Sequence, residues 1–319
     1  MSSLLAWDRR SFLQASLAAG GAAVLSTGDR LWAADSAREE DGMIDAHSHI
    51  WTRDIQRFPL AGKTTLDDLK PASFTIEELL ATARPLGVTR VVLIQHHLFH
   101  GWDNSYLIHA AKTHPDTFRV VGMVDDSAPH PDMKMRELLD EHVVSFRITP
   151  WIRGDEKWLD NDGMRLMWRT AADTGQVMGC LIDAKNLAQV DAMCRRFPDT
   201  PVVIDHFARI GVDGEIRKAD VDQLCALAKH KHTAVKVSAY YALGKKQPPY
   251  TDLLPMIRRV LDAFGPERTM WASDSPYQMM GDNTYAASLA LIREQADFLS
   301  DNDRDWLLRK TAARIYRFA

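Results

Sequence analysis

The chain has 319 residues, of which 46% are hydrophobic and 26% are charged, a balance typical of a folded globular protein. A formal net charge of −4 provides no basic surface for a phosphate backbone, so we expect no nucleic-acid partner. The three cysteines are an odd number in apolar or helical contexts, which predicts neither a disulfide framework nor a cysteine-rich zinc site. This length suits one large α/β barrel or two smaller domains.

The N-terminal segment has the features of an export signal. Residues 8–14 (DRRSFLQ) resemble the twin-arginine signal of bacteria. Residues 15–25 then form an apolar stretch, rich in Ala and Gly, that is too short to span a membrane. We therefore expect residues 1–34 to be a cleaved signal that directs the protein to the periplasm. The polar residues 35–42 are a predicted linker, and no cysteine near the cleavage region could carry a lipid anchor.

Short apolar runs alternate with helical patterns through residues 43–319. Most of the predicted strands are nearly continuous apolar runs, as expected for strands buried on both faces. The predicted strands are 43–51, 88–95, 118–124, 143–149, 176–182, 201–206, 233–239 and 268–273. The predicted helices are 75–83, 104–113, 132–141, 163–174, 187–196, 221–229, 253–264, 284–299 and 303–315. The first of these helices has a capping box formed by Thr75 and Glu78.

This order of elements predicts a fold. Strands that alternate with helices imply a parallel sheet, and eight such units with right-handed crossovers close into a (β/α)8 TIM barrel. We therefore predict that residues 43–319 form a single α/β barrel domain. A doubly wound open sheet is the alternative. It is less consistent with the sequence because the chemically active residues follow many strands, whereas an open sheet gathers them around one switch point.

Polar residues collect at the predicted strand ends, which in such a barrel form the active-site rim. His47 and His49 are two residues apart, so their side chains point to the same side of the first strand. The later strands contribute Gln95 and His96, Arg147, Asp205 and His206 with Arg209, Lys236 and Ser238 with Tyr240 and Tyr241, and Ser273 with Asp274. Several imidazoles and a carboxylate at one rim predict a catalytic site more strongly than any one of them alone.

These residues lie within segments that resemble the amidohydrolase superfamily, in particular the amidohydrolase-related branch that contains small-molecule lactonases and decarboxylases. The matching segments are 44–51 (IDAHSHIW), 87–95 (GVTRVVLIQ), 103–107 (DNSYL), 202–209 (VVIDHFAR), 265–268 (GPER), 271–276 (WASDSP) and 312–318 (AARIYRF). The resemblance spans residues 43–318. The His-x-His and Ser-Asp-x-Pro elements are its most specific parts.

The resemblance leaves the metal requirement open. Metal-dependent members add a histidine at the end of the fifth strand, where this chain has residues 178–183 (MGCLID), and binuclear members have a fourth-strand lysine where this chain has Arg147. His47, His49 and Asp274 remain as a three-ligand set that could hold one divalent metal ion such as zinc. The pattern is closer to the pyrone-dicarboxylate and sugar lactonases, some of which need no metal. We therefore favour an enzyme without a metal cofactor.

The resulting hypothesis is hydrolysis of a small-molecule lactone or a related ester-like bond. Asp274 would be the general base that activates water. His47, His49 and His206 would polarise the carbonyl group and stabilise the developing oxyanion. The predicted substrate-binding residues are Arg147, Arg209, Gln95 and Tyr240, and the two arginines would suit a substrate carboxylate.

Two other interpretations stay open at this point. The first is a metal-dependent non-oxidative decarboxylase or an amidase of the same superfamily. The second, from another class, is a barrel without catalysis that binds a small acid or a sugar. The sequence predicts a small-molecule partner and does not predict an oligomeric state.

Overall fold

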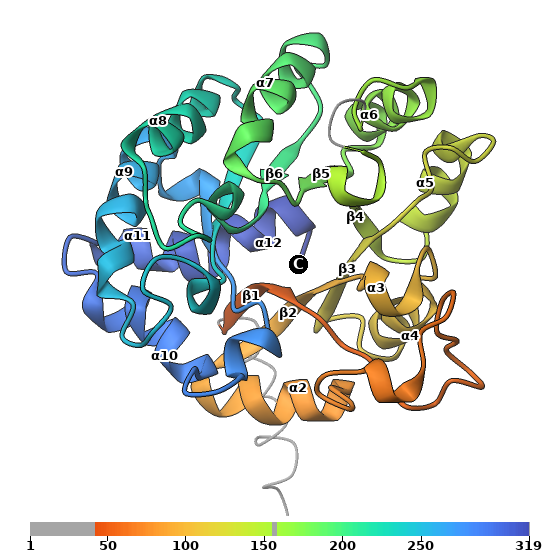
Figure 1. The fold of residues 1–319 in the computed structure, drawn as a ribbon, viewed down its shortest axis with the longest axis horizontal. Helices are drawn as coiled ribbons and strands as arrows, with labels where there is room; N and C mark the ends of the chain where they lie inside the picture. Colours follow the sequence, from red (N-terminus) through yellow and green to blue (C-terminus); the bar gives the residue numbers. More distant parts are fainter. Residues whose placement is uncertain (1–41, 155–157, 319) are drawn as a thin grey trace, which may run out of the picture. The chain divides into compact units, whose positions relative to one another are not determined.

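The computed structural model describes residues 42–154 and 158–318. The predicted export signal and all of the predicted linker except Gly42 lie outside the described residues. The eight predicted strands are all present (Figure 1). They are β1 Met43–Ser48, β2 Val88–Ile94, β3 Phe118–Gly122, β4 Val143–Ile148, β5 Val177–Cys180, β6 Val202–Ile204, β7 Thr233–Val237 and β8 Thr269–Trp271.

The strands form one parallel sheet in sequence order, from β1 to β8. The two edge strands meet just beyond their carboxyl ends, where Ser48 and Ser275 form a parallel bridge. The backbone N–H of His49 donates to the carbonyl of Ser275 over 2.8 Å, and the N–H of Asp274 donates to the carbonyl of His47 over 2.8 Å. The predicted single-domain (β/α)8 TIM barrel is thereby confirmed, and the ring closes at the residues predicted to be catalytic.

Helices surround the strands on the outside of the barrel (Figure 1). They are α2 Ile76–Ala83, α3 His97–His100, α4 Ser105–Thr113, α5 Pro131–Leu139, α6 Asp162–Thr174, α7 Leu187–Arg196, α8 Lys218–Ala226, α9 Leu254–Phe264, α10 Tyr285–Ala290, α11 Asp301–Asp305 and α12 Thr311–Tyr316. The predicted capping box at the start of α2 is confirmed, because Thr75 and Glu78 exchange backbone and side-chain hydrogen bonds. None of the helices within residues 42–154 and 158–318 is long and apolar enough to cross a membrane.

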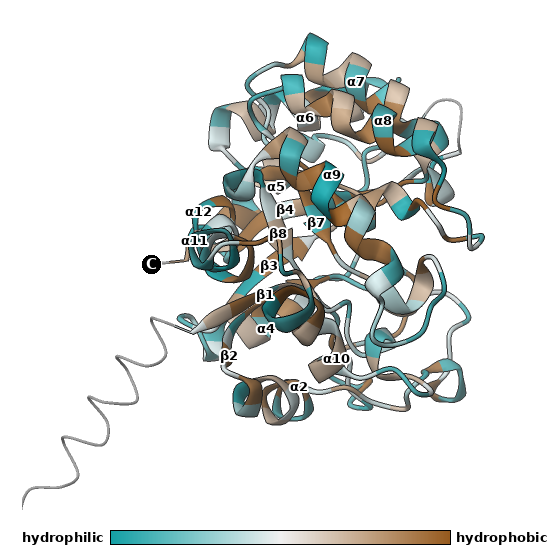
Figure 2. Cartoon of the chain, turned by 90° about the vertical axis from the view of Figure 1, so that its left-hand side faces the viewer, coloured by the Kyte–Doolittle hydropathy of each residue, from teal (hydrophilic) through white to brown (hydrophobic). Residues whose placement is uncertain are grey.

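Apolar side chains fill two layers of the barrel. The larger layer packs the strands against the surrounding helices, and its brown colour marks the inward helix faces in Figure 2. The smaller layer contains alternate strand residues such as Ile44, Val92 and Val203, which pack with Tyr316 and Phe318 at the end of the chain. These residues exclude water below the carboxyl ends of the strands, so polar groups at the rim lie on an apolar base.

One predicted helix is shorter than expected. The helix predicted over 284–299 consists of α10 followed by a single π turn, Leu291–Gln295, and ends there. The guanidinium of Arg304 donates hydrogen bonds to the carbonyls of Ile292, Ala296 and Leu299. Because this side chain satisfies the carbonyl groups left free at the helix end, the chain turns without a continuing helix.

Candidate active site

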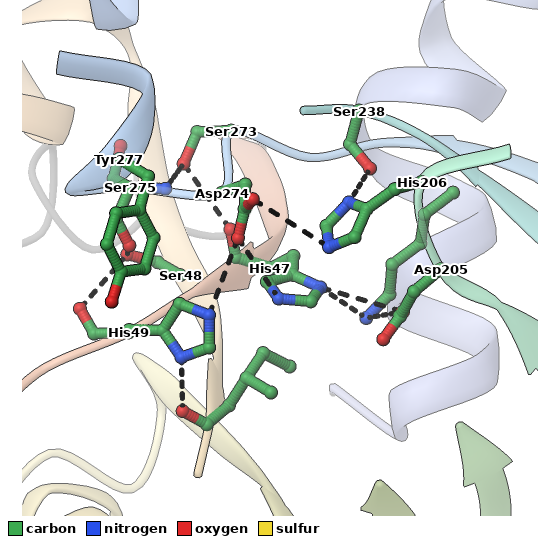
Figure 3. Close-up of polar contacts among 12 residues, drawn as sticks. His47, Ser48, His49, Asp205, His206, Ser238, Ser273, Asp274, Ser275 and Tyr277 are labelled. Atoms are coloured by element: carbon green, nitrogen blue, oxygen red, sulfur yellow. Dashed lines mark hydrogen bonds and ion pairs between the residues drawn. The ribbon is translucent and has the colours of Figure 1, made fainter. Parts of the chain in front are cut away.

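The predicted catalytic residues converge at the carboxyl ends of the strands (Figure 3). Asp274, just after β8, lies among three imidazoles. Its Oδ1 atom is 3.4 Å from the Nε2 atom of His47 and 3.4 Å from the Nε2 atom of His49, while its Oδ2 atom is 3.8 Å from the Nε2 atom of His206. His47 lies in β1, His49 follows it and His206 follows β6, so only the closed barrel brings the three histidines together.

The backbone around Asp274 holds its carboxylate at the centre of the site. Asp274 has a φ of 65°, in the left-handed region that a non-glycine residue adopts only where its surroundings require it. The hydrogen bond from its N–H to the carbonyl of His47 fixes this conformation. The hydroxyl of Tyr241 donates to Oδ2 over 2.8 Å, and only 5% of Asp274 is exposed. The carboxylate is therefore fixed in direction and almost completely shielded from bulk water.

His47 is surrounded by charged side chains. The Nη2 atom of Arg147 lies 2.9 Å from the Nε2 atom of His47, and a guanidinium can only donate, so Nε2 accepts this hydrogen bond. The Nδ1 atom of His47 then carries the proton and lies 3.6 Å from Asp205. Lys236, only 1% exposed, places its Nζ atom 3.1 Å from Asp205 and 3.3 Å from that Nδ1. Burial and the positive charge of Lys236 hold the pKa of His47 well below its ordinary value, so the ring is neutral.

The other two imidazoles are also neutral. The Nδ1 atom of His49 donates to the carbonyl of Ile94 over 2.9 Å, which leaves the Nε2 atom as an acceptor directed at Asp274. Burial lowers the pKa of His49 to about 3. Burial also lowers the pKa of His206, although Asp274 acts in the opposite direction. The Nδ1 atom of His206 shares a 2.8 Å hydrogen bond with the hydroxyl of Ser238 (Figure 3).

Asp205 and His206 are neighbours in the sequence, yet both take part in the cluster. On an ordinary strand, adjacent side chains point to opposite faces. Here β6 ends at Ile204, and the residues from His206 to Arg209 have φ values of 53–54°. This left-handed turn directs His206 toward Asp274, while Asp205 pairs with Lys236.

A cavity of about 530 Å³ opens above the cluster. A volume of this size is typical of small-molecule sites. Its lining includes Arg147, His49, His206 and Asp274 together with Tyr241 and Arg209. His47 is fully buried behind the residues that line the cavity.

Two of the predicted substrate-binding residues do not line this cavity. The side-chain amide of Gln95 is buried and donates to the carbonyls of Gly101 and Asp103, so it supports the loop after β2. Tyr240 is also buried, and its hydroxyl donates to the carbonyl of Val237. The adjacent residues His96 and Tyr241 line the cavity in place of Gln95 and Tyr240.

Arg147 and Arg209 do line the cavity, but each is already paired with a carboxylate of the protein. The Nη2 atom of Arg147 is 3.5 Å from Asp205, and the Nη1 atom of Arg209 is 2.9 Å from Asp183. The sequence predicted that both arginines pair with a substrate carboxylate. In this structure neither arginine presents an unpaired charge for that role.

Other groups of the site were not assigned a role from the sequence. Tyr277 lines the cavity and shares a 2.5 Å hydrogen bond with the Nε2 atom of His96. Lys236 lies in β7 and Tyr241 lies beyond its end, but strand periodicity could not indicate which of them faces the site. A left-handed residue at Ala239, with a φ of 58°, separates these positions and changes the direction of the chain.

The donor atoms predicted to hold a metal are correctly spaced for one. One ligand atom from each of His47, His49 and Asp274 lies within 4.8 Å of the other two, and the Nε2 atom of each histidine is 3.4 Å from Oδ1 of Asp274. Ligand atoms around a tetrahedral zinc ion are separated by about 3.3 Å. However, the lone pair of His47 that would bind the ion already accepts a hydrogen bond from the Arg147 guanidinium. The donor set therefore does not fit a metal ion unless Arg147 moves away.

Comparisons with known proteins agree with the fold. A curated L-fucono-1,5-lactonase of Burkholderia ambifaria is 28% identical over 283 residues, which cover 86% of this chain and 95% of that protein. A crystal structure of a probable 2-pyrone-4,6-dicarboxylic acid hydrolase from Acinetobacter baumannii superposes with a TM-score of 0.73 at 20% identity, covering 87% of this chain and all of the other. An amidohydrolase from Burkholderia multivorans, solved with bound zinc, has a TM-score of 0.71 at 22% identity, covering 87% of this chain and 99% of its own.

The family-level comparison covers the whole described barrel. The amidohydrolase family model matches residues 44–318, from β1 to the end of the last helix. The matched region includes the paired histidines at the end of β1 and the aspartate after β8, which form the centre of the site. This chain is therefore a member of the amidohydrolase family.

Proposed function

We propose that this protein hydrolyses the ester bond of a small-molecule lactone. The observation that carries the proposal is the arrangement of Asp274 and His49, whose acceptor atoms are 3.4 Å apart at the base of the cavity. A water molecule bound there can donate one hydrogen bond to each acceptor and direct a lone pair at a substrate carbonyl. The lactonase activity of the curated relative supports the same reaction class.

The first step is attack by this water. Its oxygen forms a bond to the lactone carbonyl carbon while Asp274 removes its proton, and the carbonyl π electrons move onto oxygen. The resulting oxyanion needs hydrogen-bond donors already in position. Arg147 supplies a permanent cation at the base of the cavity, and His206 supplies a second donor when Ser238 donates to its Nδ1 atom, which leaves a proton on Nε2.

The second step opens the ring. The oxyanion returns its electrons to form the carbonyl again, and the ring C–O bond breaks. The leaving oxygen takes the proton that Asp274 removed from water, which restores the carboxylate. The product is a hydroxy acid. The hydrogen bond from Tyr241 to Oδ2 keeps the carboxylate in one orientation during both proton transfers.

We also propose that this reaction needs no resident metal ion. The support is the contact between Arg147 and His47, in which a fixed positive charge takes the lone pair that a metal would need. A guanidinium stays protonated over the whole physiological pH range, so it can provide the electrophilic assistance that a metal provides elsewhere. The zinc in the B. multivorans structure makes a direct measurement of the metal content necessary.

The experiment that tests the function is hydrolysis of a lactone panel, followed as acid release at constant pH. Wild-type protein should open at least one lactone, and Asp274→Asn should lower kcat by roughly 10²–10⁴-fold while the thermal unfolding midpoint is retained. Full turnover by the Asp274→Asn variant would show that Asp274 is not the general base. Release of carbon dioxide from aromatic acids, without any lactone hydrolysis, would instead support the decarboxylase alternative.

We further propose that the protein is exported through its twin-arginine segment, Arg9-Arg10. Cell fractionation tests this directly, because the wild-type chain should appear in the periplasm as a shortened form. Replacing both arginines with lysine keeps the charge and should retain the full-length chain in the cytoplasm. Periplasmic recovery of the lysine variant at the wild-type level would contradict the proposal.

A further inference from the structure

The cavity above the catalytic cluster has a polar base and apolar walls. Asp274, Arg147 and the imidazoles form the base. The walls contain Leu98, Met123, Ile152, Leu181, Leu243 and Trp151. Leu98 is 75% exposed and Trp151 is 48% exposed, so the apolar surface continues outward to the mouth of the cavity. Large apolar side chains that face an open cavity indicate that the bound molecule covers them.

Each arginine of the cavity is paired with a carboxylate of the protein. Arg209 is paired with Asp183 at 2.9 Å. Its guanidinium also lies 4.5 Å from the centre of the Trp151 ring, so one face of the cation is covered. Arg147 is held between His47 and Asp205. Among the described residues that line the cavity, these are the only arginine or lysine side chains, and each has a carboxylate partner.

The imidazoles of the cavity already have hydrogen-bond partners within the protein. The Nδ1 atom of His49 donates to the carbonyl of Ile94, and the Nδ1 atom of His206 shares a hydrogen bond with the hydroxyl of Ser238. The Nε2 atom of His96 shares one with the hydroxyl of Tyr277. An anionic substrate would therefore lose its hydration without gaining an unpaired cation.

We propose, on the basis of the lactonase function proposed above, that the natural substrate class is an uncharged lactone with an alkyl or aryl substituent. The ring carbonyl lies over Asp274 and Arg147, and the substituent lies along the wall formed by Leu181, Ile152 and Leu243. Sugar hydroxyl groups placed against this wall would lose water and find no hydrogen-bond partner. This class differs from the sugar lactone and the dicarboxylate named for two of the similar proteins.

The test compares kcat/KM for four six-membered lactones that differ in their substituents. They are δ-valerolactone without a substituent, δ-nonalactone with a butyl group, glucono-1,5-lactone with hydroxyl groups, and 2-pyrone-4,6-dicarboxylate with two charges. We expect kcat/KM for δ-nonalactone to exceed that for δ-valerolactone at least about 10-fold, because each methylene in an apolar pocket increases discrimination. The two polar lactones should be poorer substrates than δ-valerolactone.

A wall variant shows whether the preference comes from this cavity. Leu181→Asn keeps the branched shape and the number of side-chain heavy atoms but adds an unpaired amide. It should lower the ratio of kcat/KM for δ-nonalactone to kcat/KM for δ-valerolactone by roughly 10-fold. Leu166→Asn, on the outer surface of α6, is the matched control and should leave the ratio unchanged. Faster hydrolysis of the sugar lactone or the dicarboxylate than of δ-nonalactone would overturn this inference and retain the lactonase function. Failure to hydrolyse any lactone would overturn the lactonase function itself.

Discussion

The Nη2 atom of Arg147 lies 2.9 Å from the Nε2 atom of His47, although His47, with His49 and Asp274, belongs to a group of side chains that could hold a metal ion. The same guanidinium is 3.5 Å from Asp205, which in turn pairs with Lys236. Two cations and one carboxylate therefore surround a neutral imidazole. A metal ion at His47 would be close to the fixed positive charge of Arg147, and the repulsion would weaken metal binding.

This relationship predicts the effect of Arg147→Gln on metal binding. The substitution removes the positive charge and frees the lone pair of His47, so the affinity for zinc should increase by at least about 10-fold. Titration with zinc, followed by calorimetry or by the metal content after gel filtration, measures the change. The lactonase activity should fall in the same variant, because the oxyanion loses its cationic partner.

Arg209→Gln provides the matched control for metal binding. Arg209 also lines the cavity, but it pairs with Asp183 and does not contact the histidine cluster. Its replacement should leave the zinc affinity at the wild-type value. Stoichiometric zinc in the wild-type protein, together with loss of activity after chelation, would contradict the metal-free proposal.

A second prediction separates the two adjacent tyrosines. Tyr241→Phe removes the 2.8 Å hydrogen bond to Oδ2 of Asp274, so kcat should fall by roughly 10-fold. Tyr240→Phe is the matched control, because it removes the same group one residue away, where the hydroxyl bonds only to a backbone carbonyl. Steady-state kinetics on one lactone is sufficient. Equal effects of the two substitutions on kcat would show that the hydrogen bond to Asp274 has no specific role.

The sequence was sufficient to predict the barrel and the centre of its site. Buried parallel strands appear as continuous apolar runs, and the polar residues after them must meet at one rim, so His47, His49, His206 and Asp274 could be grouped in advance. Their convergence follows from the order of strands alone. The predicted fold and family are both confirmed.

The prediction of which residues face the cavity was less accurate, because it depends on the direction of the backbone beyond the strand ends. The sequence favoured Gln95 and Tyr240, whereas His96 and Tyr241 face the cavity. Side-chain alternation holds only while the strand continues, and a left-handed residue such as Ala239 resets it. The pairing of Arg209 with Asp183 was also missed, because contacts between loops 26 residues apart leave no periodic pattern in the sequence.

The buried pair of Lys236 and Asp205 leads to a third prediction, on stability. Lys236→Met removes the ammonium 3.1 Å from a carboxylate that is 2% exposed, so the free energy of unfolding should fall by about 3–5 kcal/mol. The double variant with Asp205→Asn should recover part of this loss, because the unpaired buried charge is then absent. Urea unfolding measures both changes.

The control for this comparison is another lysine–aspartate pair at the surface. Lys231 and Asp199 are 3.9 Å apart, with side chains that are 73% and 74% exposed. Lys231→Met should change the free energy of unfolding by less than about 1 kcal/mol, because water and salt screen the pair. If Lys236→Met lowers the free energy of unfolding by no more than this, Arg147 and His47 alone are sufficient to stabilise the buried carboxylate of Asp205.

The buried imidazoles lead to the last prediction, on the pH dependence of stability. The folded protein holds the pKa of His49 at about 3, below the ordinary value of 6.5, so the unfolded chain binds a proton at a higher pH than the folded chain. The stability contributed by the neutral ring is complete above pH 6.5 and is lost as the pH falls toward 3. Asp45 changes the stability in the opposite direction, because its pKa is raised from 3.8 to about 6 in the folded protein. The stability that its protonated carboxyl contributes is lost as the pH rises through 6.

The histidines outnumber Asp45 in this pH range, since burial also lowers the pKa of His47, His96 and His206. We therefore expect the free energy of unfolding to decrease from pH 6.5 to pH 4.5, measured by urea unfolding at each pH. His49→Asn should make this decrease smaller, because one of the neutral rings is removed. A stability that rises as the pH falls from 6.5 to 4.5 would mean that Asp45 dominates, and that the imidazoles are protonated inside the folded protein.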